Sequence, residues 1–199
     1  MTVLIDNIIA PRVFELIRDK ISEILAVEIA NQFILTSDES INATVWLERY
    51  VPFDKVDLPA INVCLASGSY DDTSVVDQDG DFTYYIDVYT SAKTTNSQRG
   101  YLTSSLTCQR LTGIVQGILS DAKYKNLGFS EKIISNRTLR EFSILEPQNT
   151  KDAISMVMAR LTFNVRATDD EKLIEGITVG EALTTTKLND SENGLYYEV

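Results

Sequence analysis

Apolar and polar positions along the chain follow two different periods. Over residues 12–33 apolar side chains recur at three- and four-residue spacings between charged residues, which predicts an amphipathic helix whose first turn suits Pro11. A second long helix is predicted over residues 97–121, where Gly113 and Gly117 would permit close packing. The apolar stripe of this helix, which is expected to face the core of the domain, comprises Leu102, Leu106, Leu111, Ile114, Val115, Ile118 and Leu119.

Period-two alternation marks the predicted strands. Residues 43–50 suggest a short strand or arm, and residues 60–66 and 82–90 suggest two strands of a hairpin joined by a long polar loop. A second pair of β-runs covers residues 132–146 and 151–168. The order of elements predicts an α+β fold, with one mainly antiparallel or mixed sheet of four to five strands covered by two α-helices.

The periodic pattern ends shortly before the C-terminus. At 199 residues the chain has the length of one domain, and residues 1–168 are predicted to form it. Residues 169–199 are acidic and threonine-rich with only short apolar patches. We expect them to form an extended tail that is flexible or docks on a neighbouring molecule.

Charge and composition exclude several classes of function. The formal net charge is −11, which disfavours binding to the phosphates of DNA or RNA. The chain has no histidine, so histidine-based triads and zinc hydrolases are not expected. Phosphate-binding glycine loops, dinucleotide fingerprints and Gly-x-Ser-x-Gly motifs are also missing. Neither an enzymatic activity nor a cofactor is therefore expected.

Two further features bear on the environment of the chain. Cys64 and Cys108 lie in apolar or helical contexts and are expected to be buried free thiols. The N-terminus lacks a basic region and a small-residue cleavage site, and no run of 18 apolar residues occurs. Neither a signal peptide nor a membrane span is expected.

The densest group of acidic side chains lies in residues 75–90, VVDQDGDFTYYIDVYT. Asp77, Asp79 and Asp81 occupy the first, third and fifth positions of a potential calcium loop. The sixth position is phenylalanine where such loops usually have glycine, and the twelfth is valine where they have a bidentate acid. The pattern instead favours a flexible acidic hairpin loop running from Asp71 to Asp81 and including Asp72.

The strand that follows this loop carries a carboxylate among aromatic residues. Asp87 alternates onto the same face as Tyr85 and Tyr89, so it is predicted to be solvated or to line an interface rather than to be catalytic. The tyrosines either anchor a protein partner, as tyrosines often do, or pack in the core.

Four arginines form a cationic group on the last two β-runs. They pair either with carboxylates of a neighbouring copy or with Asp87 and Glu141 of the same sheet, and the pattern leaves both alternatives open. The four are Arg137, Arg140, Arg160 and Arg166.

The order and texture of the elements resemble those of tail terminator, or tail completion, proteins of tailed bacteriophages. The resemblance covers residues 10–168 and includes the segments PAINVCLASG, FTYYIDVYTSA, LTCQRLTGIVQGIL, YKNLGF and ARLTFNVRAT. It implies a structural virion protein that forms a hexameric ring, caps the tail tube and joins it to the head-completion or connector protein. It also implies assembly in the host cytoplasm, a location in the tail or neck, and DNA that passes through without specific binding.

The resemblance gives the acidic loop and the Tyr/Arg strand faces a place in such a ring. The loop would lie at a ring face or lumen, where negative charge lets DNA slide, and the strand faces would meet neighbouring subunits. The candidate interface and lumen residues are Asp71, Asp72, Asp77, Asp79, Asp81, Tyr85, Asp87, Tyr89, Arg160 and Arg166.

Three alternatives to the terminator interpretation remain at this point. One is another phage neck or baseplate adaptor protein, which would have a similar texture. Another is a small acidic domain that binds a divalent cation through Asp79, Asp81 and Asp87. The third is a bacterial adaptor protein with no viral role.

Overall fold

The computed structural model describes residues 11–54, 57–71, 78–95, 99–149 and 154–169. It contains one five-stranded mixed sheet and two α-helices, which confirms the predicted α+β fold. The predicted C-terminal tail begins at the last described residue, so its remainder lies outside the described residues. The elements are α1 (Val13–Thr36), β1 (Thr44–Leu47), β2 (Ala60–Tyr70), β3 (Gln78–Lys93), α2 (Gly100–Ser120), β4 (Ile134–Asn149) and β5 (Ile154–Asp169), with short 3-10 turns η1 (Glu39–Ile41) and η3 (Ala122–Tyr124).

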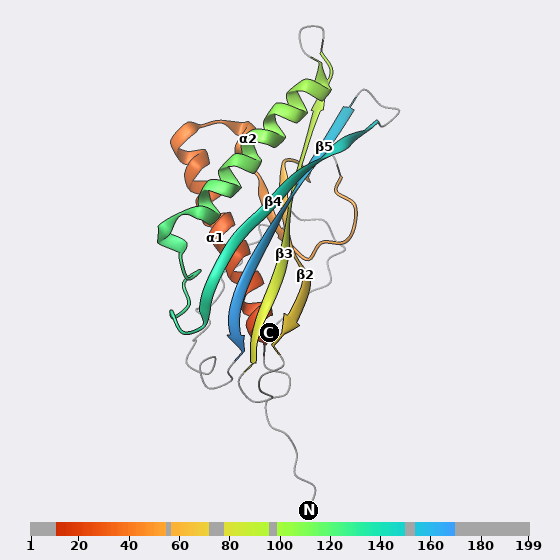
Figure 1. Cartoon of the computed structure of the whole chain (residues 1–199). Helices are drawn as coiled ribbons and strands as arrows, with labels where there is room; N and C mark the ends of the chain where they lie inside the picture. Colours follow the sequence, from red (N-terminus) through yellow and green to blue (C-terminus); the bar gives the residue numbers. More distant parts are fainter. Residues whose placement is uncertain (1–10, 55–56, 72–77, 96–98, 150–153, 170–199) are drawn as a thin grey trace, which may run out of the picture.

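The sheet has the strand order β1-β2-β3-β5-β4, so β1 and β4 are its two edges. The pairing of β1 with β2 is parallel, whereas β2–β3, β3–β5 and β5–β4 are antiparallel. Both helices lie on the same side of the sheet, with α2 crossing the long strands obliquely (Figure 1). The other face has no helix over it within the described chain, and neither described helix is long and apolar enough to cross a membrane.

Helix α1 forms where the periodicity predicts it. The Glu15 carboxylate accepts a hydrogen bond from the backbone N–H of Arg12 at 2.9 Å, which satisfies a donor at the start of the helix. Ser37 caps the C-terminal end of the helix, because its left-handed backbone lets its N–H bond to the Phe33 carbonyl at 2.8 Å. One stripe of the helix is buried against the sheet: Val13, Ile17, Ile21, Ile24, Leu25 and Ile29.

The core lies between the helices and the alternate strand residues that face them. These strand residues are at most 3% exposed, and burying each large apolar side chain contributes about 1.5–3 kcal/mol. The buried Tyr84 hydroxyl donates to the Phe14 carbonyl at 2.9 Å, so its polar end is satisfied. The central residues of this face are Phe82, Tyr84, Ile86 and Val88 of β3 and Val157, Ala159, Leu161, Phe163 and Val165 of β5.

Two glycines make room for the ring of Phe82. A Cβ added at Gly68 or Gly80 would lie 2.8 or 2.7 Å from atoms of that ring, which is closer than carbon atoms can approach. Gly68 lies directly opposite Phe82 in the β2–β3 pair. The glycines at this end of the hairpin therefore have a packing role that their polar surroundings in the sequence conceal.

The β2–β3 hairpin is longer than the sequence predicts. Ser69 pairs with Asp81 and Tyr70 with Gly80, and the Asp71 N–H bonds to the Asp79 carbonyl at 2.9 Å. The prediction that residues 71–81 form one loop is therefore wrong for Asp79 and Asp81, which lie in β3. Because β5 also pairs with this part of β3, ladder bonds on both sides override the weak strand propensity of aspartate and glycine.

Helix α2 confirms the predicted stripe over its second half, where Leu111, Val115, Ile118 and Leu119 are buried, but not over its first half. Leu102 and Leu106 are 52% and 56% exposed, so their prediction as core residues is wrong. The inward positions near the helix start are instead Ser104 and Cys108. Ser104 exchanges hydrogen bonds with Thr90 of β3, because small side chains let the helix approach the sheet closely here.

Gly113 and Gly117 of α2 do not mark the close packing that the sequence predicts. A Cβ added at either position would meet nothing within 4 Å in the described chain. Both glycines therefore lower the helix propensity without a packing gain inside this molecule, and that cost is about 1 kcal/mol each.

Candidate functional site: the open face of the sheet

The sheet face opposite the helices, called the open face below, carries most of the predicted site residues. The strand register arranges its side chains in rows that run across β2, β3, β5 and β4. Serine, threonine and asparagine alternate there with isolated arginine–carboxylate pairs. The four central rows are Asn62–Asp87–Arg160–Ser143, Cys64–Tyr85–Thr162–Glu141, Ser67–Thr83–Asn164–Thr138 and Ser69–Asp81–Arg166–Asn136.

Asp87 and Arg160 form a two-pronged ion pair at the centre of this face. The Arg160 Nε and Nη2 donate to the two Asp87 carboxylate oxygens, each at 2.7 Å. The Asp87 side chain is only 5% exposed, so the solvated alternative predicted for it is wrong, and the interface-lining alternative stays a prediction. Register explains the burial, because Arg160 lies directly opposite Asp87 and compensates its charge. The hydrogen bond with Asp87 raises the pKa of Arg160 above its ordinary value.

Tyr85 and Tyr89 flank this ion pair and are both half-buried. The Arg160 guanidinium lies 4.3 Å from the centre of the Tyr85 ring, a cation–π contact. The Tyr89 ring lies 4.6 Å from that of Phe53, and its hydroxyl donates to Asp87 at 3.4 Å. Burial raises the pKa of Tyr89 to about 12. Both tyrosines are thus held in fixed positions while part of each ring remains accessible.

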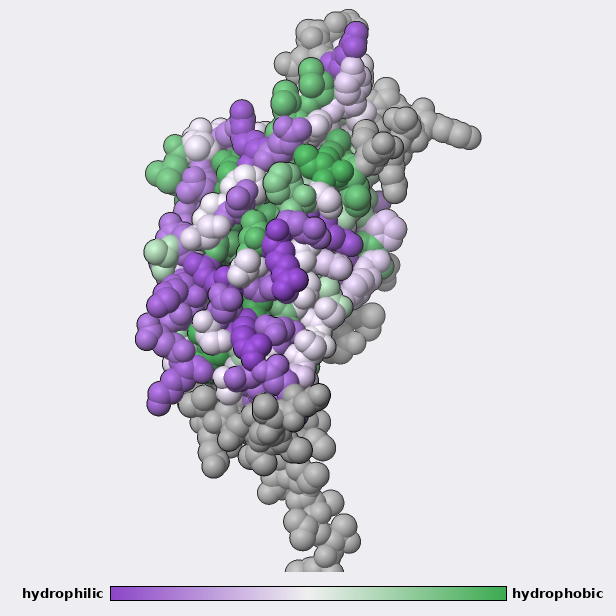
Figure 2. Space-filling model, viewed as in Figure 1, coloured by the Kyte–Doolittle hydropathy of each residue, from purple (hydrophilic) through white to green (hydrophobic). Residues whose placement is uncertain are grey.

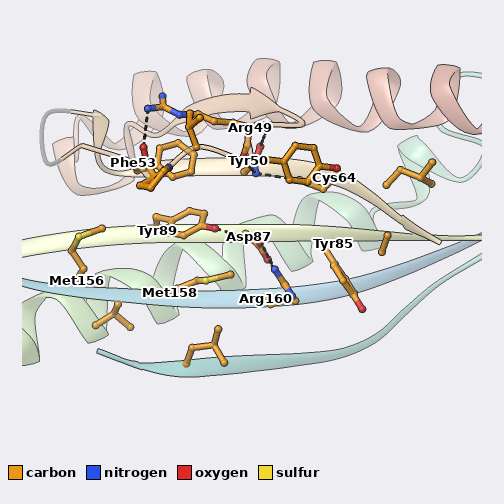
Figure 3. Close-up of a pocket in the computed structure, with 17 residues that line it drawn as sticks. Arg49, Tyr50, Phe53, Cys64, Tyr85, Asp87, Tyr89, Met156, Met158 and Arg160 are labelled. Atoms are coloured by element: carbon orange, nitrogen blue, oxygen red, sulfur yellow. Dashed lines mark hydrogen bonds and ion pairs between the residues drawn. The ribbon is translucent and has the colours of Figure 1, made fainter. Parts of the chain in front are cut away.

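A groove of about 780 Å³ lies on the open face, and the Asp87–Arg160 ion pair is part of its lining. The chain after β1 crosses this face, so residues 49–53 form one wall and the strands form the floor (Figure 3). Phe53 lies against Tyr89, and the methionines of β5 lie beside them. The lining is mainly apolar with one buried charge pair: Arg49, Tyr50, Phe53, Cys64, Tyr85, Asp87, Tyr89, Leu145, Met156, Met158 and Arg160 are among its residues.

Asn62 anchors the wall of this groove, a role that the sequence analysis missed. Its side chain accepts from the Arg49 N–H at 3.0 Å and donates to the Arg49 carbonyl at 2.9 Å. The Arg49 guanidinium lies between the rings of Trp46 and Phe53, at 4.3 and 4.4 Å. The sequence does contain a signal for this role, because Asn62 lies in the middle of an apolar strand. A buried amide needs hydrogen-bond partners, so its side chain could be expected to bind another segment of the chain.

Cys64 lies in the groove but does not have the properties of a nucleophile. It and Cys108 are buried free thiols, as predicted. Burial raises the pKa of Cys64 to about 11, so the thiol is protonated at neutral pH.

A second charge cluster occupies the lower end of the open face. Arg166 donates to Asp81 at 2.9 Å and also to Asp71, while the Thr168 hydroxyl donates to Asp79 at 2.6 Å. These contacts hold the base of the hairpin against the end of β5. The hydrogen bond with Asp71 raises the pKa of Arg166.

The four arginines of the last two β-runs resolve into different roles. Arg160 and Arg166 pair with carboxylates of their own sheet, and Arg137 donates to the Leu119 and Asp121 carbonyls at the end of α2. Arg140 is exposed, and the described part of the chain provides no partner for it or for Glu141. The predicted pairing within the sheet is therefore confirmed for Asp87 but not for Glu141.

The predicted acidic residues do not converge on one point. Asp81 and Asp87 are separated along β3 by about 20 Å, given about 3.3 Å per residue, so one cation cannot bridge them. Asp72 and Asp77 lie outside the described residues. Among the residues that are described, no group of three or more aspartates, glutamates or cysteines could hold a metal ion.

The sequence matches no protein-family model and no curated protein. The function is therefore inferred from the order of the elements and from the geometry of the sheet.

Proposed function

We propose that this protein is a structural component of a bacteriophage tail: a terminator that forms a hexameric ring, ends growth of the tail tube and joins the tail to the head connector. The resemblance of residues 10–168 to tail terminator proteins supports this proposal. The structural observation that carries it is the one-sided sheet. Two helices cover one face, and the described residues of the other face present fixed tyrosines and arginine–carboxylate pairs.

The open face has the properties of a surface that meets other proteins. Tyr85 and Tyr89 supply rigid aromatic area, and interfaces are enriched in tyrosine and arginine. Arg160 and Arg166 already have carboxylate partners, so burying this face would leave neither guanidinium group without a counter-charge. In the proposed ring this face meets neighbouring subunits or lines the passage.

The charge of the chain suits a ring through which DNA passes. With a formal net charge of −11, the protein repels phosphates and gains nothing from counterion release. DNA would therefore slide through the ring without being held. A gel-shift experiment at physiological salt is expected to give no retained DNA.

The decisive experiment adds the purified protein to polymerising tail-tube subunits of the same phage. The proposal predicts that tubes become shorter and that electron micrographs show a ring at one end of each tube. A neck or baseplate adaptor would instead leave tube length unchanged. Tubes that grow to the same length with and without the protein would contradict a terminator role.

A further inference from the structure

The groove on the open face has apolar side chains on its rim that the described chain does not cover. Tyr50 and Val51 of the wall are 77% and 63% exposed, and Leu145 of β4 is 45% exposed. Met156 and Met158 of β5 also line the groove, and methionine side chains adapt to irregular partners. The groove volume of about 780 Å³ lies within the range of about 300–1,000 Å³ that is usual for ligand sites. The groove therefore has the make-up of a site that another segment or molecule fills.

The accessible charge in the groove is positive. Arg160 is 38% exposed, whereas its partner Asp87 is only 5% exposed. Arg160 uses Nε and Nη2 to bind Asp87, and its Nη1 has no hydrogen-bond partner among the described residues. An occupant that carries an acidic group beside apolar side chains would therefore complement the groove.

The chain beyond the end of β5 contains a segment with this chemistry. Residues 170–199 carry seven acidic residues and two lysines. Their only aromatic residues are Tyr196 and Tyr197, which lie between Leu195 and Glu198. Tyrosine supplies a large apolar ring with one polar end, which suits a groove that is apolar and partly open to water.

The length of the chain allows the two tyrosines to reach the groove. Arg160 is the lining residue of β5 nearest to Asp169, and the two are separated by about 30 Å at about 3.3 Å per residue. A flexible linker of about 25 residues, the length of residues 170–194, spans about 25–30 Å on average. The two lengths match, and the effective concentration of a tethered segment is highest under that condition.

The apolar residues closer to β5 are not suited to the groove. Leu173 and Ile174 lie at most about 18 Å from Asp169 even when the chain between them is fully extended, which is too short. Ile177 and Val179 approach the required distance only at full extension, which costs the linker its conformational freedom.

A polar surface lies between the end of β5 and the groove. Both helices cover the other face, so a segment that turns back along the sheet can lie on the open face. The row Ser67–Thr83–Asn164–Thr138 lies along this path. Figure 2 shows a similar division in its view, with hydrophilic side chains toward the end of β5 and hydrophobic side chains gathered toward the opposite end. The polar and threonine-rich residues 180–194 suit this path better than the groove itself.

We propose that Leu195, Tyr196 and Tyr197 bind in the groove of their own chain, with Glu198 beside Arg160. Any protein that binds this part of the open face must then displace the segment. The inference goes beyond the proposed function, and none of its steps depends on the terminator role.

NMR of the methionine methyl groups in the full chain tests this occupancy, because two of the three methionines line the groove. In protein labelled with ¹³C at these methyl groups, Y196S/Y197S should shift the signals of Met156 and Met158, since the ring currents of the bound tyrosines are lost. The single variants M156L and M158L assign the two signals. E198K should shift both signals part of the way toward those of the double variant, because it places a cation beside Arg160.

A second double variant of the same segment is the matched control. L173S/I174S also removes two apolar side chains from residues 170–199, but at positions that cannot reach the groove. Both methionine signals should stay where they are in the unaltered protein. Circular dichroism of the two double variants checks that each still folds.

The outcomes separate this occupant from the others. Methionine signals that are identical with and without the two tyrosines would overturn the proposal. Equal shifts in L173S/I174S would assign the groove to the nearer segment and would overturn it as well. Labelled Y196S/Y197S is finally mixed with an excess of unlabelled, unaltered protein, and its signals should stay shifted. A return to the unaltered positions would mean that a second copy supplies the tyrosines, which contradicts binding within one chain.

Discussion

The two faces of the sheet are built from neighbouring residues of the same strands, yet they are held by different forces. On the helix-covered face, Ile86 and Leu161 are fully buried among apolar side chains. At the adjacent position of each strand, Asp87 and Arg160 form an ion pair beside a groove. Strand alternation therefore separates the part of the molecule that supplies folding free energy from the part that presents a surface.

The largest expected effect comes from the covered face. Leu161→Ala should lower the free energy of unfolding by about 3 kcal/mol, because it removes buried methyl groups and leaves a cavity. Its neighbour Thr162 is half-buried on the open face, and Thr162→Ala should cost less than about 1 kcal/mol. Urea unfolding at a fixed protein concentration, followed by the fluorescence of the single tryptophan, Trp46, measures both. Equal losses of unfolding free energy in the two variants would contradict the claim that the covered face supplies most of the folding free energy.

The next effect tests whether the open face has a stabilising element of its own. Arg160→Met should cost about 2 kcal/mol, because Asp87 stays buried without a counter-charge; the 38% exposure of Arg160 keeps this below the full penalty. The double variant D87L/R160M should recover most of that loss, since neither charge remains. A double variant as unstable as the single one would show that the ion pair is not the cause.

A smaller effect of opposite sign is expected on the outer side of the helices. Gly113→Ala should raise the unfolding free energy by about 1 kcal/mol, since the added methyl group meets nothing in the described chain. Gly100 is the internal control, because a Cβ there would lie 2.7 Å from the Ala92 carbonyl oxygen and Gly100→Ala should destabilise. If Gly113→Ala were destabilising, the outer face of α2 could not be free in the folded protein.

The smallest effect concerns the polar contacts that tie the helix layer together. Hydrogen bonds from Lys123 and Tyr124 lower the pKa of Glu28 from 4.5 to about 2. The ionised form is thus favoured in the folded protein, so its contribution is present above pH 4.5 and is lost as the pH falls toward 2. Glu28→Gln should reduce the loss of stability over that interval relative to the unaltered protein. An unchanged pH profile would contradict this linkage.

The sequence predicts the elements well because their periodicity is local. The stripes of α1 and of the covered strand face follow directly from spacing, as Ile17 and Leu161 illustrate. The errors arise where contacts with residues distant in the sequence determine which side chains are buried. Leu102 fits a helical stripe, but α2 buries small residues near Thr90 instead.

The candidate site is harder to predict for the same reason. Asp87 has the sequence context of a solvated residue, and only the register with β5 places Arg160 opposite it. The groove wall needs the crossing of residues 49–53 over the open face, which no local pattern encodes. Asp79 and Asp81 follow a polar loop but join the ladder because β5 extends alongside them.

The central claim is that this chain works as a ring of identical subunits. Native mass spectrometry of the full chain, alone and with tail-tube protein, tests it most directly. The account predicts one dominant assembly with the mass of six 22.3 kDa chains. A single species at 22.3 kDa under every condition, including with tail-tube protein present, would contradict it.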